Sequence, residues 1–266
     1  MENKEPNRYT KILEAIFENH FRKGMTEIEF ERTELGQVAN KLGIALPKNL
    51  GDVLYSFRYR TFLPKSITSK APKGHEWIIR PAGKGKYKLV IVKQSVIIPS
   101  HILAETKIPD STPGVIAKYS MNDEQSLLAK LRYNRLIDIF TGITCYSLQN
   151  HLRTTLSDGS QVETDEIYIG LDKRGAHYIL PVQAKGGRDK IGIVQIEQDI
   201  ELCTSKFPGL ICRAIAAQFI EDNLIALFEF EQTKEGIRVS SEKHYRLVKP
   251  EELSSDELKS YYVRQG

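Results

Sequence analysis

The sequence predicts an α/β protein of two domains, and three observations lead to this prediction. Helical apolar stripes and a hairpin pattern occupy the first hundred residues. From residue 117 onward, a helix is followed by alternating strands. Between them, residues 97–116 are rich in proline and small polar residues, as linkers are. With 266 residues, 41% of them hydrophobic, the chain is long enough to form two hydrophobic cores.

Apolar residues in the first hundred positions recur three times at helical spacing. Between the first two stripes, Glu27 to Glu31 alternates acidic with apolar residues, which indicates a short strand. Gly43 follows the second stripe and Pro47 precedes the third. Two apolar runs, 77–80 and 87–92, flank glycines and lysines and so predict a hairpin. The stripes are Leu13, Ile16, Phe17 and Phe21; Leu35, Val38, Ala39 and Leu42; and Leu50, Val53, Leu54 and Phe57.

This order of helix, strand, two helices and a hairpin resembles that of winged-helix domains, so residues 1–96 are expected to form one. In winged-helix proteins the third helix often enters the major groove of DNA, and the hairpin, called the wing, lies on the phosphate backbone. The resemblance therefore implies DNA contacts from the third helix and from the wing. The residues implied are Tyr55, Ser56, Arg58, Tyr59 and Arg60 on the helix, and Lys84, Lys86 and Lys88 on the wing.

The distribution of charge supports nucleic-acid binding by this domain. Residues 41–95 contain 12 Lys or Arg residues against only Asp52 and Glu76, a net charge of +10, whereas the whole chain carries +4. Basic charge concentrated on a small module is typical of proteins that bind nucleic acids. The alternative is a solvated basic surface on a winged helix that binds another protein.

A capped helix is predicted from residue 122 onward. Asn122 suits the N-cap, and Gln125 three residues later completes a capping-box pattern. The core-facing stripe of this helix consists of Glu124, Leu127, Leu128 and Leu131. A carboxylate in such a stripe is either a first-turn acid that the helix dipole favours and that is rotated to water, or a functional acid.

Two strands after this helix place chemically useful residues together. In residues 163–171, Asp165 lies on one face, because strand side chains alternate. In residues 178–185 the same rule makes Gln183 and Lys185 neighbours on one face. The polar residues and glycine at 172–175 favour a tight turn. The sequence therefore predicts a hairpin in which Asp165 faces Gln183 and Lys185, although a solvated hairpin with ordinary surface charges has the same pattern.

An acid, an amide and an amine in this arrangement suit the hydrolysis of a nucleic-acid backbone. That reaction requires a hard cation on the phosphate, an activated water, and positive charge where negative charge develops. Mg²⁺ takes oxygen ligands and keeps several waters, so few protein ligands suffice. Lys185 could hold or help to deprotonate the attacking water.

These residues resemble the motif of the PD-(D/E)XK nuclease superfamily, which includes most type II restriction endonucleases. Asp165 matches the first acid, Lys185 the lysine, and Glu124 the glutamate that often precedes them on a helix. Gln183 stands where the family usually has Asp or Glu, so it would supply an uncharged oxygen, and weak metal binding or an inactive site is the alternative. The resemblance implies a catalytic set of Asp165, Gln183, Lys185 and Glu124, with Mg²⁺ held by Asp165, Gln183 and Glu124. It also implies a restriction-endonuclease-like α/β/α core with a central mixed sheet in residues 117–266.

Residues around the motif offer further DNA contacts. Asn150, His151 and Arg153 lie in a predicted strand before the acidic one, where they could touch DNA or simply bond a neighbouring strand or turn. Arg188 follows two glycines that could let the backbone approach a phosphate, although a plain turn has the same composition. Gln195 and Gln198 share a helix face that is expected to be solvated.

The function predicted from these observations is a Mg²⁺-dependent, sequence-specific endonuclease of double-stranded DNA, of the type II restriction class. The resemblance implies a homodimer on palindromic DNA and a cognate DNA methyltransferase in the same system. A DNA-binding regulator with an inactive nuclease-like domain and a repair or recombination nuclease are the alternatives.

The cysteines and the chain start complete the prediction. Cys145, Cys203 and Cys212 are odd in number and lack CxxC spacing, so they are expected to be buried thiols rather than zinc ligands. The polar start and the absence of a long apolar run predict no signal peptide or membrane span, and a cytoplasmic location.

Overall fold

A computed structural model of the chain describes residues 9–263 except 60, 122 and 188. Two of the predicted DNA contacts, Arg60 and Arg188, therefore lie outside the described residues. The predicted helix cap Asn122 lies outside them as well.

Contacts divide the chain into two units. The first consists of residues up to 97 together with 154–161 and 192–194, and the second consists of the remaining residues. Within the described part of the chain, no helix has both the length and the apolar character that crossing a membrane requires.

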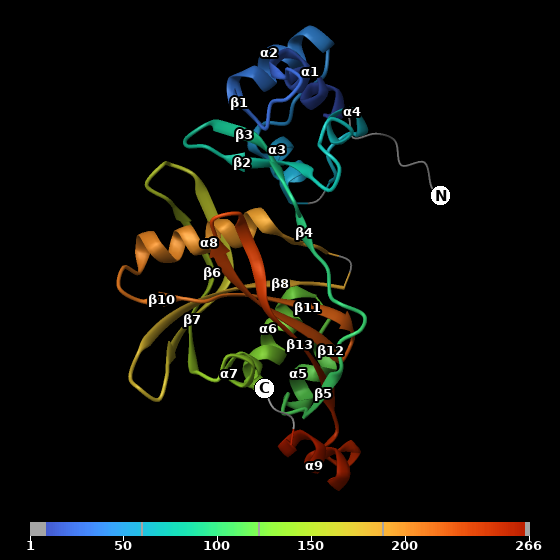
Figure 1. Cartoon of the computed structure of the whole chain (residues 1–266), viewed down its shortest axis with the longest axis vertical. Coiled ribbons are helices and arrows are strands. Elements are labelled where there is room, and N and C mark those ends of the chain that lie inside the picture. Colours follow the sequence, from blue (N-terminus) through green and yellow to red (C-terminus); the bar gives the residue numbers. More distant parts are fainter. Residues whose placement is uncertain (1–8, 60, 122, 188, 264–266) are drawn as a thin grey trace. The chain divides into compact units, whose positions relative to one another are not determined.

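The first unit combines helices with a three-stranded antiparallel sheet in which β3 lies between β1 and β2 (Figure 1). Most residues of the predicted stripes form its core: Leu13, Ile16 and Phe17 of the first helix, Leu35, Val38 and Ala39 of the second, and Val53, Leu54 and Phe57 of the third are all buried. Phe21 and Leu50 are only half-buried, and Leu42, the last residue of its helix, is exposed. Helix α4 was not predicted, because four residues are too few for a periodic pattern. The elements are α1 (Thr10–His20), β1 (Glu27–Glu31), α2 (Arg32–Leu42), α3 (Gly51–Tyr59), α4 (Lys65–Thr68), β2 (Glu76–Pro81), β3 (Lys86–Val92) and β4 (Val96–Ile97).

The ends of α2 follow from its sequence. At the start, Glu31 and Glu34 form a reciprocal capping box, which satisfies backbone N–H groups that the helix leaves without partners. At the end, Gly43 takes the left-handed conformation at φ 66°, which glycine adopts without steric cost. Gly43 therefore closes this helix as the sequence predicted.

The second unit has a mixed sheet flanked by helices, as the predicted α/β class requires. Its path runs β5-β13-β12-β11-β8-β7-β6, and β10 pairs with β8 beside this path. Strand β8 is parallel to β11, and β13 to β5; the β7–β8, β11–β12 and β12–β13 pairs are antiparallel. The strands of this sheet are β5 (Glu105–Pro109), β6 (Thr144–Thr155), β7 (Gln161–Leu171), β8 (His177–Lys185), β10 (Ile211–Cys212), β11 (Ala214–Glu221), β12 (Leu224–Thr233) and β13 (Gly236–Val248). The short strand β9 (Ile191–Gly192) is not part of it. The helices are α5 (Gly114–Tyr119), α6 (Glu124–Tyr133), α7 (Leu136–Thr141), α8 (Ile193–Lys206), the 3₁₀ turn η1 (Pro250–Glu252) and α9 (Ser255–Val263).

The predicted linker, residues 97–116, contains regular structure instead of a free connection. Strand β5 pairs in parallel with β13 at the edge of the large sheet. Glu105 on β5 also forms an ion pair with Arg246 on β13. Pro109 is compatible with this strand because an edge position leaves its missing N–H without consequence. The composition of the segment suggested a loop, but its pairing is set by the distant strand β13.

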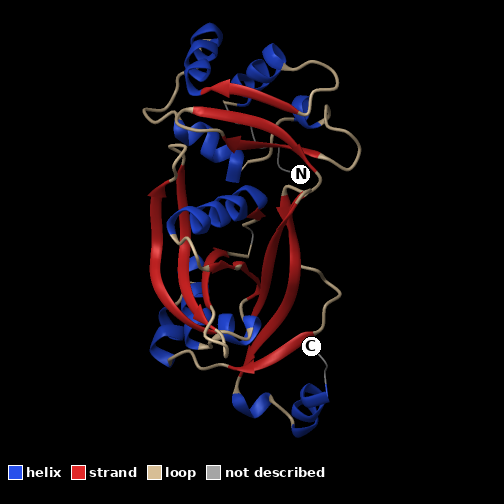
Figure 2. Ribbon diagram, turned by 60° about the vertical axis from the view of Figure 1, so that its left-hand side comes forward, coloured by secondary structure: helices blue, strands red, loops and turns tan. Residues whose placement is uncertain are grey.

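Helices cover both faces of the large sheet. Leu180, Val182 and Ala184 of β8 pack in one core cluster with the leucines of α6. Gln183, which points to the opposite face, contacts a side chain of α8. Figure 2 shows the strands curving around α8. The end of β8 is therefore the place where residues from α6 and α8 can approach the same two strands.

Candidate active site

The predicted acidic and apolar strands pair as the antiparallel hairpin of β7 and β8. The register runs from Glu166, opposite Val182, to the turn at residues 172–175. Next to the Glu166–Val182 pair, Asp165 Oδ2 accepts a hydrogen bond from the backbone N–H of Ala184 at 2.8 Å. The carboxylate of Asp165 is therefore fixed between the two strands, one residue from Lys185.

Lys185 links two carboxylates that are distant in the sequence. Its Nζ lies 3.1 Å from Glu124 Oε1 and 3.6 Å from Asp165 Oδ2. Asp165 and Lys185 are each only 8% exposed, whereas 39% of the Glu124 side chain is exposed. Buried charges need partners of opposite sign, and each of these two has one in the other. The structure thus brings together three of the four predicted catalytic residues.

Glu124 reaches this cluster because it is the first residue of α6. Asp123 caps the helix and accepts a hydrogen bond from the backbone N–H of Ser126 at 2.9 Å. The helix therefore starts at the acid that the sequence placed in its core-facing stripe.

Gln183 has hydrogen-bond partners that the prediction did not include. Its amide nitrogen donates to Asp199 Oδ2 at 2.9 Å and to the backbone oxygen of Glu163 at 3.3 Å. The expected position, with Gln183 facing Asp165, was inferred from strand alternation alone. Alternation gives the face of a side chain but not the hydrogen-bond partner, and here the partner comes from α8.

Asp199 is the site residue that the sequence analysis missed. It is fully buried, and its Oδ1 accepts a hydrogen bond from Thr164 Oγ1 at 2.5 Å. Burial raises the pKa of Asp199 to about 7, against the opposing effect of the two hydrogen bonds that its carboxylate accepts. The available signal was its position three residues after Ile196 and four before Cys203, both buried. A carboxylate in an apolar helical stripe needs a polar partner.

Gln218 was also missed, although it lies beside the site. It stands directly next to Lys185 in the parallel pairing of β11 with β8. Gln218 is 7% exposed, and its amide nitrogen donates to the backbone oxygen of Asp189 at 2.7 Å. It therefore holds the loop that follows Lys185.

Glu166 adjoins Asp165 in the sequence but faces away from the site. Ser147 Oγ donates to it at 2.5 Å, and Arg132 Nε lies 3.4 Å from it on the side of α6. Burial raises the pKa of Glu166. This buried acid is thus part of the packing between β6, β7 and α6.

The donor chemistry of the site fits Mg²⁺, which prefers carboxylate and amide oxygens and retains several waters. Asp165 and Glu124 offer two carboxylates around Lys185. Among the residues that the structure describes, no group of three or more His, Cys, Asp or Glu side chains is arranged to hold a metal ion. No model of a known protein family matches the sequence, and no curated protein or solved structure matches the chain. The function must therefore be argued from the geometry of these side chains.

The predicted contacts on β6 occupy a long strand at the edge of the sheet. Asn150 and His151 are exposed, and His151 takes a left-handed backbone conformation at φ 47°. The ring of His151 contacts the side-chain amide of Gln125, next to Glu124, with nitrogens 2.8 Å apart. Arg153 forms an ion pair with Glu163 at 2.9 Å. His151 therefore contacts the residue that follows Glu124, and Arg153 has an acidic partner.

On α3, three of the predicted DNA contacts lie against one another. The rings of Tyr55 and Tyr59 meet edge to face with centroids 4.7 Å apart, and the Arg58 guanidinium lies 4.7 Å from the Tyr59 centroid. Tyr55 is 42% exposed. Ser56 is half-buried, and its hydroxyl contacts that of Thr61 at 3.0 Å. Ser56 thus stabilises the end of the helix, whereas the other three present an aromatic and cationic surface.

The wing lysines differ in their surroundings. Lys84 and Lys86 are exposed on the β2–β3 hairpin. Lys88 instead forms ion pairs with Glu27 and Glu29 of β1, at 2.8 and 2.7 Å. Its hydrogen bonds to these two carboxylates raise the pKa of Lys88 to about 12. The Lys88 charge is therefore already compensated within the sheet.

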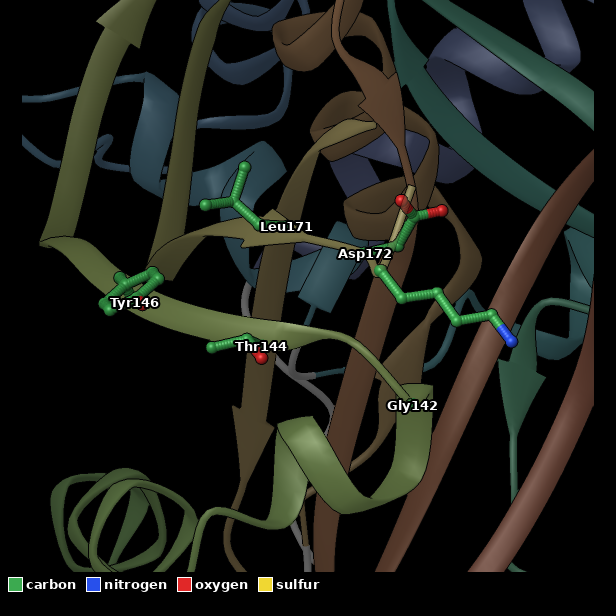
Figure 3. A pocket seen from close by; sticks show the side chains of 6 residues that line it. Gly142, Thr144, Tyr146, Leu171 and Asp172 are labelled. Atoms are coloured by element: carbon green, nitrogen blue, oxygen red, sulfur yellow. The ribbon is translucent and has the colours of Figure 1, made fainter. Parts of the chain in front are cut away.

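A pocket of about 350 Å³ at the other end of the β7–β8 hairpin contains none of the predicted site residues. Figure 3 shows its lining from the start of β6 and the end of β7. Asp172 in this pocket already accepts hydrogen bonds from Arg174, Ala176 and Tyr178. The carboxylate of Asp172 thus stabilises the hairpin turn.

Proposed function

We propose that this protein is a Mg²⁺-dependent endonuclease that cuts double-stranded DNA at specific sequences, as type II restriction enzymes do. The observation that carries the proposal is the contact of Lys185 with both Asp165 and Glu124. An amine and two acids from separate elements meet at one strand end, an arrangement that suits metal-assisted phosphodiester hydrolysis. We take residues 117–266 as a restriction-endonuclease-like α/β/α core and residues 1–96 as a winged helix.

Asp165, Glu124 and the amide oxygen of Gln183 would hold the Mg²⁺ ion. When bound, the ion would supply positive charge to the phosphate and lower the pKa of an attacking water. Lys185 donates hydrogen bonds to a phosphate oxygen as its negative charge grows, or holds the attacking water. Asp165 stays in place because the N–H of Ala184 fixes its carboxylate. Asp165 and Lys185 are both largely buried, so water competes little for their interactions.

The first unit would select the DNA sequence in this proposal. The exposed part of α3 and the lysines of the wing supply aromatic and cationic groups for the major groove and the phosphates. A palindromic site has two equivalent strands, so we propose a homodimer, and a methyltransferase of the same system would protect the host DNA.

The test is incubation of plasmid DNA with the purified protein and Mg²⁺. Discrete fragments are expected, and they should disappear when a chelator removes the ion. Asp165→Ala and Lys185→Ala should each lower the rate by about 100-fold or more while retaining DNA binding in a mobility-shift assay. Asp256→Ala is the matched control, since the Asp256 side chain is 93% exposed on α9. Full activity in both site variants would reject this assignment.

A DNA-binding regulator with an inactive nuclease-like domain is the second candidate. It is favoured by the uncharged Gln183 and by Lys185, whose ammonium already pairs with both nearby acids. The same experiment separates the candidates. Shifted but intact DNA supports the regulator, and nicking that depends on branched or distorted DNA supports a repair or recombination nuclease.

A further inference from the structure

Beneath the cluster around Lys185 lies a buried polar group made of Thr164, Gln183 and Asp199. Thr164 and Asp199 are 0% exposed and Gln183 is 1% exposed. The three residues come from β7, β8 and α8 respectively. Buried polar groups are stable only when their hydrogen bonds are satisfied, so the partners within this group determine the orientation of each side chain.

The hydrogen bonds fix the amide of Gln183. An amide nitrogen carries two hydrogens, and that of Gln183 has two acceptors, Asp199 Oδ2 at 2.9 Å and Glu163 O at 3.3 Å. The amide oxygen must therefore turn away from Asp199. Reversing the amide would place its oxygen against a carboxylate oxygen and remove both bonds.

Asp199 is itself poorly placed to reach a ligand. Its two oxygens each accept a hydrogen bond, Oδ1 from Thr164 at 2.5 Å and Oδ2 from Gln183 at 2.9 Å. Asp199 therefore acts on neighbouring side chains and not directly on substrate.

We propose that Asp199 is a positioning residue that fixes the Gln183 amide, so that an uncharged oxygen faces the metal and the substrate at the candidate site. This inference rests on the proposed function and deepens it. It makes position 183 dependent on position 199: an amide is needed at 183 because a carboxylate occupies 199. The nuclease pattern usually has an acid at the position of Gln183. In this protein Asp199 on α8 would compensate for the missing acid by orienting the Gln183 amide.

The inference predicts an unusual response to substitution. Gln183→Glu brings the sequence closer to the nuclease pattern, yet it would remove the amide hydrogens that Gln183 donates to Asp199 Oδ2 and Glu163 O and would place a second carboxyl group beside Asp199. We expect this variant to bind Mg²⁺ about 10–100-fold more weakly, the usual effect of losing a partner that orients a ligand. Asp199→Asn should have a similar effect, because its amide would favour reversal of the Gln183 amide.

The double variant combines Gln183→Glu with Asp199→Asn and exchanges the two functional groups. The amide introduced at position 199 can then donate a hydrogen bond to the carboxylate introduced at position 183. The pairing of one amide with one carboxylate is thereby restored across β8 and α8, whereas the longer bond from position 183 to Glu163 O at 3.3 Å is not. We therefore expect the Mg²⁺ affinity of the double variant to recover to within a few-fold of the wild type.

Mg²⁺ binding by calorimetry, plasmid cleavage and thermal unfolding should be measured on all four proteins. Gln232→Glu makes the same change at an exposed position of β12 and serves as the matched control. Recovery of both Mg²⁺ affinity and cleavage in the double variant supports the positioning role. A purely structural role would lower the melting temperature in the single variants but leave the Mg²⁺ affinity of the folded protein unchanged.

Two outcomes overturn the inference while leaving the proposed function intact. In the first, Gln183→Glu binds Mg²⁺ and cleaves as well as the wild type. In the second, Asp199→Asn loses Mg²⁺ and the double variant does not recover, which would make Asp199 a direct ligand. A wild-type protein that neither binds Mg²⁺ nor cleaves DNA overturns the proposed function itself, and the positioning role with it. The melting temperatures would still report whether residues 183 and 199 are coupled.

Discussion

Lys185 donates a hydrogen bond to Glu124 at 3.1 Å, although 61 residues separate them in the sequence. The contact joins the start of α6 to the end of β8. Lys185 is buried and Glu124 is partly exposed, so the acid has room to contact a ligand as well as the amine. Glu124 could bind the metal ion or only hold Lys185. Substitutions can separate these two roles, because Gln removes the charge but keeps a hydrogen-bond acceptor, whereas Ala removes both.

We predict that Glu124→Gln and Glu124→Ala lower plasmid cleavage by a similar factor, about 10-fold or more. Gln keeps an oxygen that can accept from Lys185 but lacks the charge that favours Mg²⁺. If Glu124 only holds Lys185, the Gln variant should retain most of the activity and the Ala variant should not. Initial rates over a range of Mg²⁺ concentrations measure the difference, and a Gln variant as active as the wild type contradicts a role in metal binding.

Local pattern was enough to predict the β7–β8 hairpin and the proximity of Asp165 to Lys185. Both depend on strand alternation and on a turn between adjacent strands, which the sequence displays directly. The contact of Gln183 with Asp199 depends on how α8 packs against the sheet. A periodic pattern identifies a buried face but not what it packs against, so this contact could not be predicted.

The same limit explains the misread linker. Strand β5 has five residues, one of them Pro109, and stands among proline and small polar residues. Its regularity comes from pairing with β13, more than 130 residues later, and from the Glu105–Arg246 ion pair. Neither interaction leaves a local signal. Edge strands of this kind are where composition is least informative.

Lys130→Met should destabilise the second unit by about 1–3 kcal/mol, the usual cost of leaving buried acceptors without donors. Lys130 is 7% exposed, and its Nζ donates to Asp222 O at 2.6 Å and Asn223 Oδ1 at 3.3 Å. Methionine preserves the packing of the stem but removes both bonds. Urea unfolding gives the free energy of unfolding. Lys118→Met, at an exposed position of α5, should change it by less than about 0.5 kcal/mol, and an equal effect in both variants would contradict the prediction.

Asp172→Asn should destabilise the protein near neutral pH and have little effect in acid. Hydrogen bonds to its carboxylate lower the pKa of Asp172 from 3.8 to about 2, and the bond from the backbone N–H of Ala176 has the largest effect. A carboxyl group whose pKa is lower in the folded state stabilises that state above its unfolded pKa, and the stabilisation is lost as the pH falls through the folded value. The difference in unfolding free energy between the two proteins should therefore shrink as the pH falls from 3.8 toward 2.

Asp256→Asn is the control for this measurement. Asp256 lies on α9, where its exposed side chain forms an ion pair with the exposed Lys259. Its effect on stability should be small at every pH. A difference between wild type and Asp172→Asn that stays constant from neutral pH into acid would mean that packing, rather than the charge of Asp172, holds the hairpin turn.

The wing lysines should contribute unequally to DNA binding. Lys84→Gln and Lys86→Gln should each reduce the slope of log affinity against log salt concentration by about 1, since each exposed ammonium that contacts a phosphate releases about one counterion. Lys88→Gln should change the slope much less, because Glu27 and Glu29 already bind its ammonium. Fluorescence anisotropy with a labelled duplex over a range of salt concentrations measures the three slopes. Equal reductions in all three variants would mean that Lys88 leaves its acidic partners when DNA binds, and no reduction in any of them would remove the wing from the DNA interface.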